Sequence, residues 1–340
     1  MSAVIKQMAA GIALHRVFDA FPSNVLFIPV LSLFIVSLWS FYSYILLQQI
    51  PGPFLAAFSN LPRVSWVLSN RAHDIHIDLH RKYGKLVRFG PNMVSVGDPA
   101  EIPTLYSFTG KFTKSDFYHV IVFYAKGKPV QTIFTTQDEN MHRMLKRPIA
   151  GIYTMSNLMS FEPYVDTTIS FFFAQLDKRF AQTGDICNLG TWLQMFAFDV
   201  MGELTFSKRL GFLERAEDVD GIMESIWHYF QKTTPVTQIP WVDRLWAKNP
   251  IFQRLKAVRM NPIAGFGLAR IAERKSAPDT SDDKESSTNS RDFLSRFLEA
   301  QAKDKSIPPW ALTAWTTSNI AAGSDTTAIL LRTTITLTTN

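Results

Sequence analysis

The chain has 340 residues, of which 46% are hydrophobic and 19% are charged, and this composition excludes a disordered protein. Its single cysteine, Cys187, excludes a disulfide framework, a four-cysteine zinc site and a cysteine-ligated iron–sulfur cluster. The net charge of +6 lies entirely between Arg63 and Arg147, where thirteen basic residues are set against seven acidic ones. Such a patch suits nucleic acid, anionic lipid or an acidic protein. Because no basic run carries interleaved stacking aromatics, we expect no nucleic acid and favour lipid or protein.

The N-terminal part of the chain predicts a membrane anchor. Residues 25–47 form a run of 23 residues without a charge, which is long enough to cross a bilayer as a helix. Trp39, Tyr42 and Tyr44 near its end are typical of a membrane interface. A cleaved signal peptide is a rival interpretation, but the run is too long for one, and a buried core helix is rarely apolar on every face. The preceding segment 1–24 is compatible with either an interfacial helix or a frayed terminus.

Beyond the anchor, the pattern predicts a mainly α protein with a small β element. Pro51-Gly52-Pro53, within a Pro-rich hinge over 48–62, forms a stiff elbow. A helix near 71–83 is expected to end at Gly84, and a β-hairpin follows with strands near 86–89 and 93–96. Further helices are expected after a capping box over 136–139, from Pro163, near 191–206, 218–232 and 251–274, from Phe293, and after Pro309, with a polar loop over 275–290.

The segment 319–327, Asn-Ile-Ala-Ala-Gly-Ser-Asp-Thr-Thr, carries the sharpest functional signal. Small residues such as Ala322 and Gly323 let a flat ligand approach a helix backbone. The hydroxyl of Thr326 can bond back to a carbonyl and bend the helix. An acid such as Asp325 beside a hydroxyl suits a proton relay. Taken alone, the segment is equally compatible with an ordinary polar helix end.

The pattern Ala-Gly-x-Asp-Thr-Thr resembles the oxygen-activation motif in the central helix of cytochromes P450. The anchor, the Pro-Gly-Pro hinge, Lys82-Tyr83-Gly84 and Asp98-Pro99-Ala100 follow in the order of a microsomal member, and segments 161–166 and 198–206 resemble the fungal branch around pisatin demethylase-like enzymes. The resemblance implies a cytochrome P450 fold over 63–332.

The resemblance also implies a function. It implies a heme b cofactor, oxidation of an apolar small molecule in fungal secondary metabolism, and electrons from NADPH-cytochrome P450 reductase. It places the protein in the endoplasmic reticulum membrane as a single-pass protein with a cytosolic body. The basic stretch before Arg147 would contribute to the face that meets the reductase. Trp241 and Trp246 would dip into the membrane near the substrate entrance, although a plain loop with surface aromatics fits equally well.

The resemblance assigns roles to six residues by position. Thr326 would hold the proton donor for bound oxygen, Asp325 would relay protons, and Ala322 with Gly323 would leave room for oxygen above the heme. His142 and Lys146 take the places of Trp and Arg in the family's Trp-x-x-x-Arg motif, which bonds a heme propionate. These two are four residues apart on one helix face, so both can reach one anion, although Lys lacks the fork of Arg. A solvated basic helix face is the alternative.

Two departures from the family bear on activity. The family's heme-ligating cysteine loop, Phe-x-x-Gly-x-x-x-Cys, and its Glu-x-x-Arg motif do not occur in these 340 residues. Cys187 lies in an unrelated setting and fits a small apolar residue, so no metal ligand is predicted. The tail over 333–340 diverges from the family, and five Thr in seven residues predict that the helix does not continue there. The fold is therefore expected to be incomplete at the C-terminus.

Three functional hypotheses follow. The chain is the N-terminal part of a heme-thiolate cytochrome P450 monooxygenase, and it is inactive as it stands because no residue supplies the thiolate. Alternatively, it is a membrane-anchored, heme-free remnant. The third hypothesis is a single-span membrane scaffold that has kept the likeness without using it.

Overall fold

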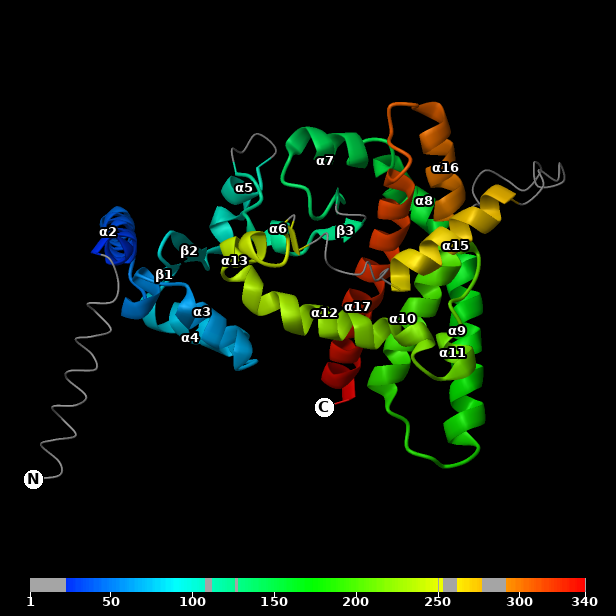
Figure 1. Cartoon of the computed structure of the whole chain (residues 1–340). Coiled ribbons are helices and arrows are strands. Elements are labelled where there is room, and N and C mark those ends of the chain that lie inside the picture. The colour runs from blue at the N-terminus through cyan, green and yellow to red at the C-terminus, as the bar shows by residue number, and fades with distance from the viewer. Residues whose placement is uncertain are drawn as a thin grey trace, which may run out of the picture. The chain divides into compact units, whose positions relative to one another are not determined.

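The computed structural model describes residues 23–107, 112–125, 128–249, 251–252, 262–276 and 292–339, and most of them are helical (Figure 1). The chain divides into two compact units, Met1–Phe112 and Thr113–Asn340. The mainly helical architecture with two short hairpins confirms the predicted fold class. The segment predicted before the anchor and nearly all of the polar loop predicted over 275–290 lie outside the described residues.

The N-terminal unit combines a long apolar helix with a small α/β body. Its elements are α2 (Ser23–Leu46), η1 (Phe54–Ala57), α3 (Leu61–Leu68), α4 (Ala72–Tyr83), β1 (Leu86–Gly90), β2 (Met93–Val96), η2 (Pro99–Glu101) and α5 (Ile102–Leu105). Within α2, Phe27–Leu46 is long and apolar enough to cross a membrane, and no other helix among the described residues is. The antiparallel β1–β2 hairpin occurs where it was predicted, with Leu86 opposite Val96. Gly84 ends α4 at φ +94°, a backbone conformation that favours glycine.

The C-terminal unit is a helical body built around α10 and α17, which lie side by side (Figure 1). Its core is rich in aromatic side chains, and Phe198, Phe297 and Trp315 are almost fully buried there. Its elements are α6 (Phe117–Val120), β3 (Phe123–Ala125), β4 (Lys128–Val130), α7 (Glu139–Lys146), η3 (Ala150–Tyr153), α8 (Met155–Met159), α9 (Glu162–Leu176), η4 (Asp177–Ala181), α10 (Leu189–Phe206), α11 (Phe212–Arg215), η5 (Val219–Gly221), α12 (Ile222–Thr237), α13 (Pro240–Leu245), α15 (Pro262–Ser276), α16 (Phe293–Lys303) and α17 (Ala311–Thr339).

The start of α7 differs in detail from the predicted capping box. Asp138, not Thr136, is the N-cap: its Oδ1 accepts hydrogen bonds from the backbone N–H of Asn140 at 2.8 Å and of Met141 at 3.3 Å. The hydroxyl of Thr136 instead accepts a bond from the backbone N–H of Asp138 at 3.3 Å. A carboxylate is the better cap because it carries a full charge at the positive end of the helix dipole.

The prediction that the helix stops before the threonine-rich tail is wrong, because α17 continues to Thr339. Four threonines of the tail donate their hydroxyl to the carbonyl four residues earlier, at 2.9–3.0 Å: Thr333, Thr334, Thr336 and Thr338. Each hydroxyl thus pairs with a carbonyl of the same helix, an arrangement that threonine readily adopts in a helix.

A buried carboxylate joins α10 to the turn before α11. Asp199 is fully buried, and it accepts three backbone hydrogen bonds: Gly211 at 2.8 Å and Phe212 at 3.2 Å on Oδ1, and Leu213 at 2.8 Å on Oδ2. Burial raises its pKa, and the three N–H donors and Arg209 work against that rise. The side chain therefore satisfies the first backbone donors of α11 deep in the protein.

We expect Asp199→Ala to lower the free energy of unfolding by about 3 kcal/mol, because it leaves several buried N–H groups without an acceptor. Asp218 is the matched control, since it accepts from the N–H groups of Met223 and Glu224 at 2.9 Å in a less buried place. Asp218→Ala should cost about 1 kcal/mol. Chemical denaturation measures both, and equal costs would contradict the role given to Asp199.

Candidate functional site

The middle of α17 packs against α10, and this contact fixes which side of the 319–327 segment is covered. A Cβ atom added to Gly323 would lie 2.5 Å from Sδ of Met201 on α10, so the space beside Gly323 is already filled. Ser324 is fully buried and donates its hydroxyl to the carbonyl of Ile320 at 2.8 Å. Gly323 therefore allows the two helices to approach closely.

Asp325 also lies on the covered side, where a glutamine of α10 holds it. Gln194 Nε2 donates to Asp325 Oδ1 at 2.7 Å, and Gln194 Oε1 accepts from the guanidinium of Arg332 at 2.9 Å. Arg332 Nε in turn donates to the carbonyl of Gly190 at 2.8 Å. The neutral amide thus lies between an acid and a base, both on α17, and ties them to α10 through charge-assisted bonds.

The opposite side of α17 is open. Ala322, Thr326, Ile329 and Leu330 recur at helical spacing and are all exposed, with Ile329 61% and Leu330 64% accessible to solvent. Thr326 donates its hydroxyl to the carbonyl of Ala322 at 2.7 Å, and its oxygen keeps the capacity to accept another bond. This side, named here the open face of α17, is apolar with one hydroxyl in it.

The predicted anion-binding pair lies at the end of α7. His142 is half-buried and Lys146 is exposed. The pKa of His142 is lowered, first by burial and then by the charge of Lys114, with Lys146 adding to the effect and Glu139 opposing it. Lys114 donates to the carbonyls of Ile133 and Phe134, both at 2.8 Å. Two lysines and one carboxylate thus surround His142, and the net positive charge of this cluster favours an incoming anion.

A buried hydrogen bond connects α7 to α17. Trp315 on α17 donates its indole N–H to the carbonyl of Leu145 at 3.1 Å, and both side chains are almost fully buried. Within the described ranges no hydrogen bond or ion pair joins His142 or Lys146 directly to Ala322 or Thr326. Helix α7, which carries His142 and Lys146, is therefore bonded to α17, which carries Ala322 and Thr326, but the side chains of these two described pairs form no bond with each other.

Sequence reasoning missed four residues that shape this site: Lys114, Gln194, Met201 and Arg332. No local sequence pattern marks them, because each one interacts with a residue at least 28 positions away in the chain. A glutamine on a mostly apolar helix, as Gln194 is on α10, is the one signal available beforehand, since buried polar side chains need a partner.

Cys187 does not fit the role of a metal ligand. It is half-buried, packs against the hydrophobic core, and burial raises its pKa, which disfavours the thiolate. In the part of the chain that the structure describes, no three or more His, Cys, Asp or Glu side chains converge to form a metal site.

Comparison with known proteins places the chain among relatives of one kind. A family model described as cytochrome P450 matches residues 50–338. A cytochrome P450 monooxygenase of Aspergillus terreus is 57% identical over 92% of this chain and 63% of its own length. The monooxygenases cicH and pkfB of Emericella nidulans are 51% and 48% identical, over 88% and 84% of this chain and 59% and 56% of their own lengths. The chain thus spans about six-tenths of the length of these relatives.

The basic cluster predicts a measurable titration. His142 should titrate below its ordinary pKa of 6.5, so it is neutral at pH 7 and offers an N–H without a charge. Lys146→Met should move its pKa upward by removing a like charge, whereas Lys305→Met, an exposed lysine that does not act on His142, should not. NMR titration of the ring measures this, and a pKa that Lys146→Met leaves unchanged would contradict the cluster.

The lowered pKa of His142 also makes the stability of the protein depend on pH. Because the folded state resists protonation of His142 and the unfolded chain does not, the free energy of unfolding should fall as the pH drops below 6.5.

Proposed function

This chain belongs to the cytochrome P450 family, and from that premise we propose that it is the N-terminal part of a membrane-anchored, fungal heme-thiolate monooxygenase. In this proposal it supplies the wall on the oxygen side of a heme and one contact to a heme propionate. The observation that carries the proposal is the open face of α17, an apolar surface with small Ala322 and hydroxyl-bearing Thr326, left uncovered while the other side of the helix is fastened to α10.

The residues of this chain fit the heme at two places and fail at a third. The open face of α17 suits a flat apolar ring, because an alanine and a threonine let it come close to the helix. The cluster of Lys114, His142 and Lys146 suits a propionate, which is an anion that accepts hydrogen bonds. We do not propose Cys187 as the thiolate ligand, because it packs against the hydrophobic core and burial raises the pKa of its thiol.

A heme-thiolate group, when bound, would supply the chemistry by which dioxygen, two electrons and two protons give one oxygen atom to the substrate and one molecule of water. Ala322 leaves room beside the helix. Thr326 holds a proton at Oγ1, which points to the carbonyl of Ala322 at rest and must rotate away from it to donate elsewhere.

Asp325 is the proposed source of protons for Thr326, and its carboxylate must first move or bind a water to reach the hydroxyl. Its Oδ1 is held by Gln194 on the covered side of α17, whereas Thr326 lies on the open face. Adjacent residues on a helix point about 100° apart, so the carboxylate reaches the hydroxyl only by leaving Gln194 or through a water. Gln194 therefore sets the resting position of the acid.

We propose the remaining features of the whole enzyme from the family. α2 anchors the protein in the endoplasmic reticulum membrane with its body in the cytosol, and NADPH-cytochrome P450 reductase delivers the electrons to a face that includes the basic stretch before Arg147. The substrate is an apolar small molecule of fungal secondary metabolism. Trp241 and Leu245 of α13, with Trp246, are exposed and support a contact with lipid near its entrance.

The 340 residues alone are proposed to form no thiolate-ligated heme. We expect the purified chain to give no thiolate-type absorption band with carbon monoxide after reduction. A chimera should give that band if it joins this chain to the portion of the Aspergillus terreus relative that follows the aligned region. His142→Leu with Lys146→Met should weaken heme retention in the chimera, while Lys305→Met should not.

Either of two results would contradict this function. A thiolate-type band from the chain alone would show that a residue within it ligates the iron. A chimera that folds, by circular dichroism, and takes up no heme would favour the heme-free scaffold instead.

A further inference from the structure

Arg88 on β1 is a buried cation whose partners are main-chain carbonyls. Its side chain is 2% exposed, and within the part of the chain that the structure describes no carboxylate pairs with it. Burial lowers its pKa. It donates to five carbonyl oxygens: Ser43 at 2.9 Å, Tyr44 at 3.1 Å, Ala57 at 3.1 Å, Gly90 at 3.4 Å and Pro91 at 2.6 Å. A guanidinium so enclosed is costly to bury, so the segments that it joins are held firmly.

These carbonyls come from three separate segments. Ser43 and Tyr44 lie in the last turn of α2, whose carbonyls have no partner inside the helix, and the positive guanidinium also complements the negative end of the helix dipole. Ala57 ends η1, and Gly90 with Pro91 forms the hairpin turn. Arg88 therefore fastens the end of the apolar helix to both η1 and the hairpin.

The main chain reinforces this junction. The backbone N–H of Arg88 donates to the carbonyl of Pro51 at 2.8 Å. A Cβ atom on Gly52 would lie 1.9 Å from the carbonyl oxygen of Arg88, so the Pro-Gly-Pro elbow touches β1 where only glycine fits. The Pro-Gly-Pro elbow is therefore bonded to β1 and packed tightly against it.

Aromatic side chains extend the apolar surface of α2 onto η1. Tyr44 of α2 stacks on Phe58 with ring centres 5.2 Å apart, and Phe54 packs its edge on Phe58 at 5.1 Å. Phe54 and its neighbour Leu55 are nevertheless 71% and 69% exposed. These two large apolar side chains lie next to the end of a helix that is apolar on every side, so their surface is continuous with that of α2.

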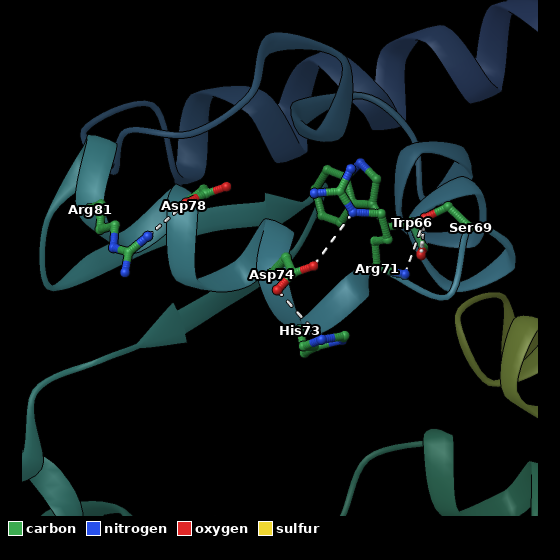
Figure 2. Close-up of polar contacts among 7 residues, drawn as sticks. All are labelled: Trp66, Ser69, Arg71, His73, Asp74, Asp78 and Arg81. Atoms are coloured by element: carbon green, nitrogen blue, oxygen red, sulfur yellow. Dashed lines mark hydrogen bonds and ion pairs between the residues drawn. The ribbon is translucent and has the colours of Figure 1, made fainter. Parts of the chain in front are cut away.

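Another part of the same unit is charged instead. The exposed side of α4 carries the ion pairs Arg71–Asp74 at 3.4 Å and Arg81–Asp78 at 3.2 Å (Figure 2). Side chains of this kind remain in water. The N-terminal unit thus offers an apolar patch beside the anchor and a hydrated surface on α4.

We propose that Arg88 fixes the exit of the anchor helix so that Phe54 and Leu55 lie in the lipid interface, as a second membrane contact of the N-terminal unit. The proposal rests on the proposed function in one respect, that α2 is a membrane anchor. The occupant of the patch is lipid, because the patch continues the surface of α2 and Arg88 prevents the two from swinging apart. Arg88 is a positioning residue here and touches no lipid itself.

The test places one environment-sensitive fluorophore at a time on the full chain in phosphatidylcholine vesicles. Cys187→Ser removes the native thiol, and a cysteine labelled with a nitrobenzoxadiazole dye is introduced by Val36→Cys, Phe54→Cys, Leu55→Cys or Asp78→Cys. We expect the dye at 36, 54 and 55 to emit at shorter wavelength and to be quenched by nitroxide-labelled lipid. The dye at 78, on the charged side of α4, should be quenched by aqueous iodide.

The outcomes separate the two claims. A dye at 36 that iodide reaches would overturn the anchor and the second contact together. A dye at 36 in lipid with 54 and 55 in water would overturn the second contact alone.

Arg88→Lys and Arg88→Met test the junction, with exposed Arg81→Met as the control. Either Arg88 variant should expose the dye at 54 and 55 to iodide and leave the dye at 36 in lipid, because neither side chain can reach all five carbonyls. Unchanged lipid quenching at 54 and 55 in a folded Arg88→Lys protein would overturn the role of Arg88. If Arg88→Met does not fold, the lysine variant and the unsubstituted chain still decide the question.

Discussion

The packing of α17 on α10 decides which side of α17 remains for a ligand. Gly323 allows the helices to approach until Met201 fills the space beside it, and Ser324 is buried in the same contact. With that side closed, Ala322 and Thr326 are left on the open face. The two halves of the Asp-Thr pair therefore have different surroundings, since α10 holds the acid and the hydroxyl lies on the apolar side. A proton that moves between them crosses from one side of the helix to the other.

Buried cations join separate segments in both units. Arg88 binds five carbonyls in the N-terminal unit, and Lys248, 7% exposed at its side chain, pairs with Asp243 at 2.9 Å in the C-terminal unit and donates to the carbonyls of His119 and Val120. Each charge is compensated by polar groups from distant parts of the chain, so removing it would leave several of them unsatisfied. The hairpin turn after β1 and the end of α6 are held in place in this way.

Local chemistry was predictable from the sequence, and long-range pairing was not. The hairpin after Gly84 and the helix that follows Phe161 were predicted because turn residues and proline act on their own neighbours. The family followed from the segment 319–327 together with the anchor, the Pro-Gly-Pro hinge and several short segments in the expected order. The bonds that shape the site were beyond reach, because Gln194 and Asp325 are 131 positions apart and no alternation or spacing connects them. The tail was mispredicted because helix propensity is a weak signal, and a helix that is already formed can continue through threonines whose hydroxyls bond to its own carbonyls.

A double-mutant cycle between Gly323 and Met201 tests most directly whether α10 covers this side of α17. Gly323→Ala should lower the free energy of unfolding by about 1–2 kcal/mol, because the added methyl overlaps Met201 Sδ. In a Met201→Ala background, the same substitution should cost much less, since the overlapping atoms are gone. Such a coupling would place Gly323 against α10 and leave Ala322 and Thr326 to the ligand. Additive effects would mean that Gly323 does not face Met201, and the open face of α17 would then have to be assigned to other residues.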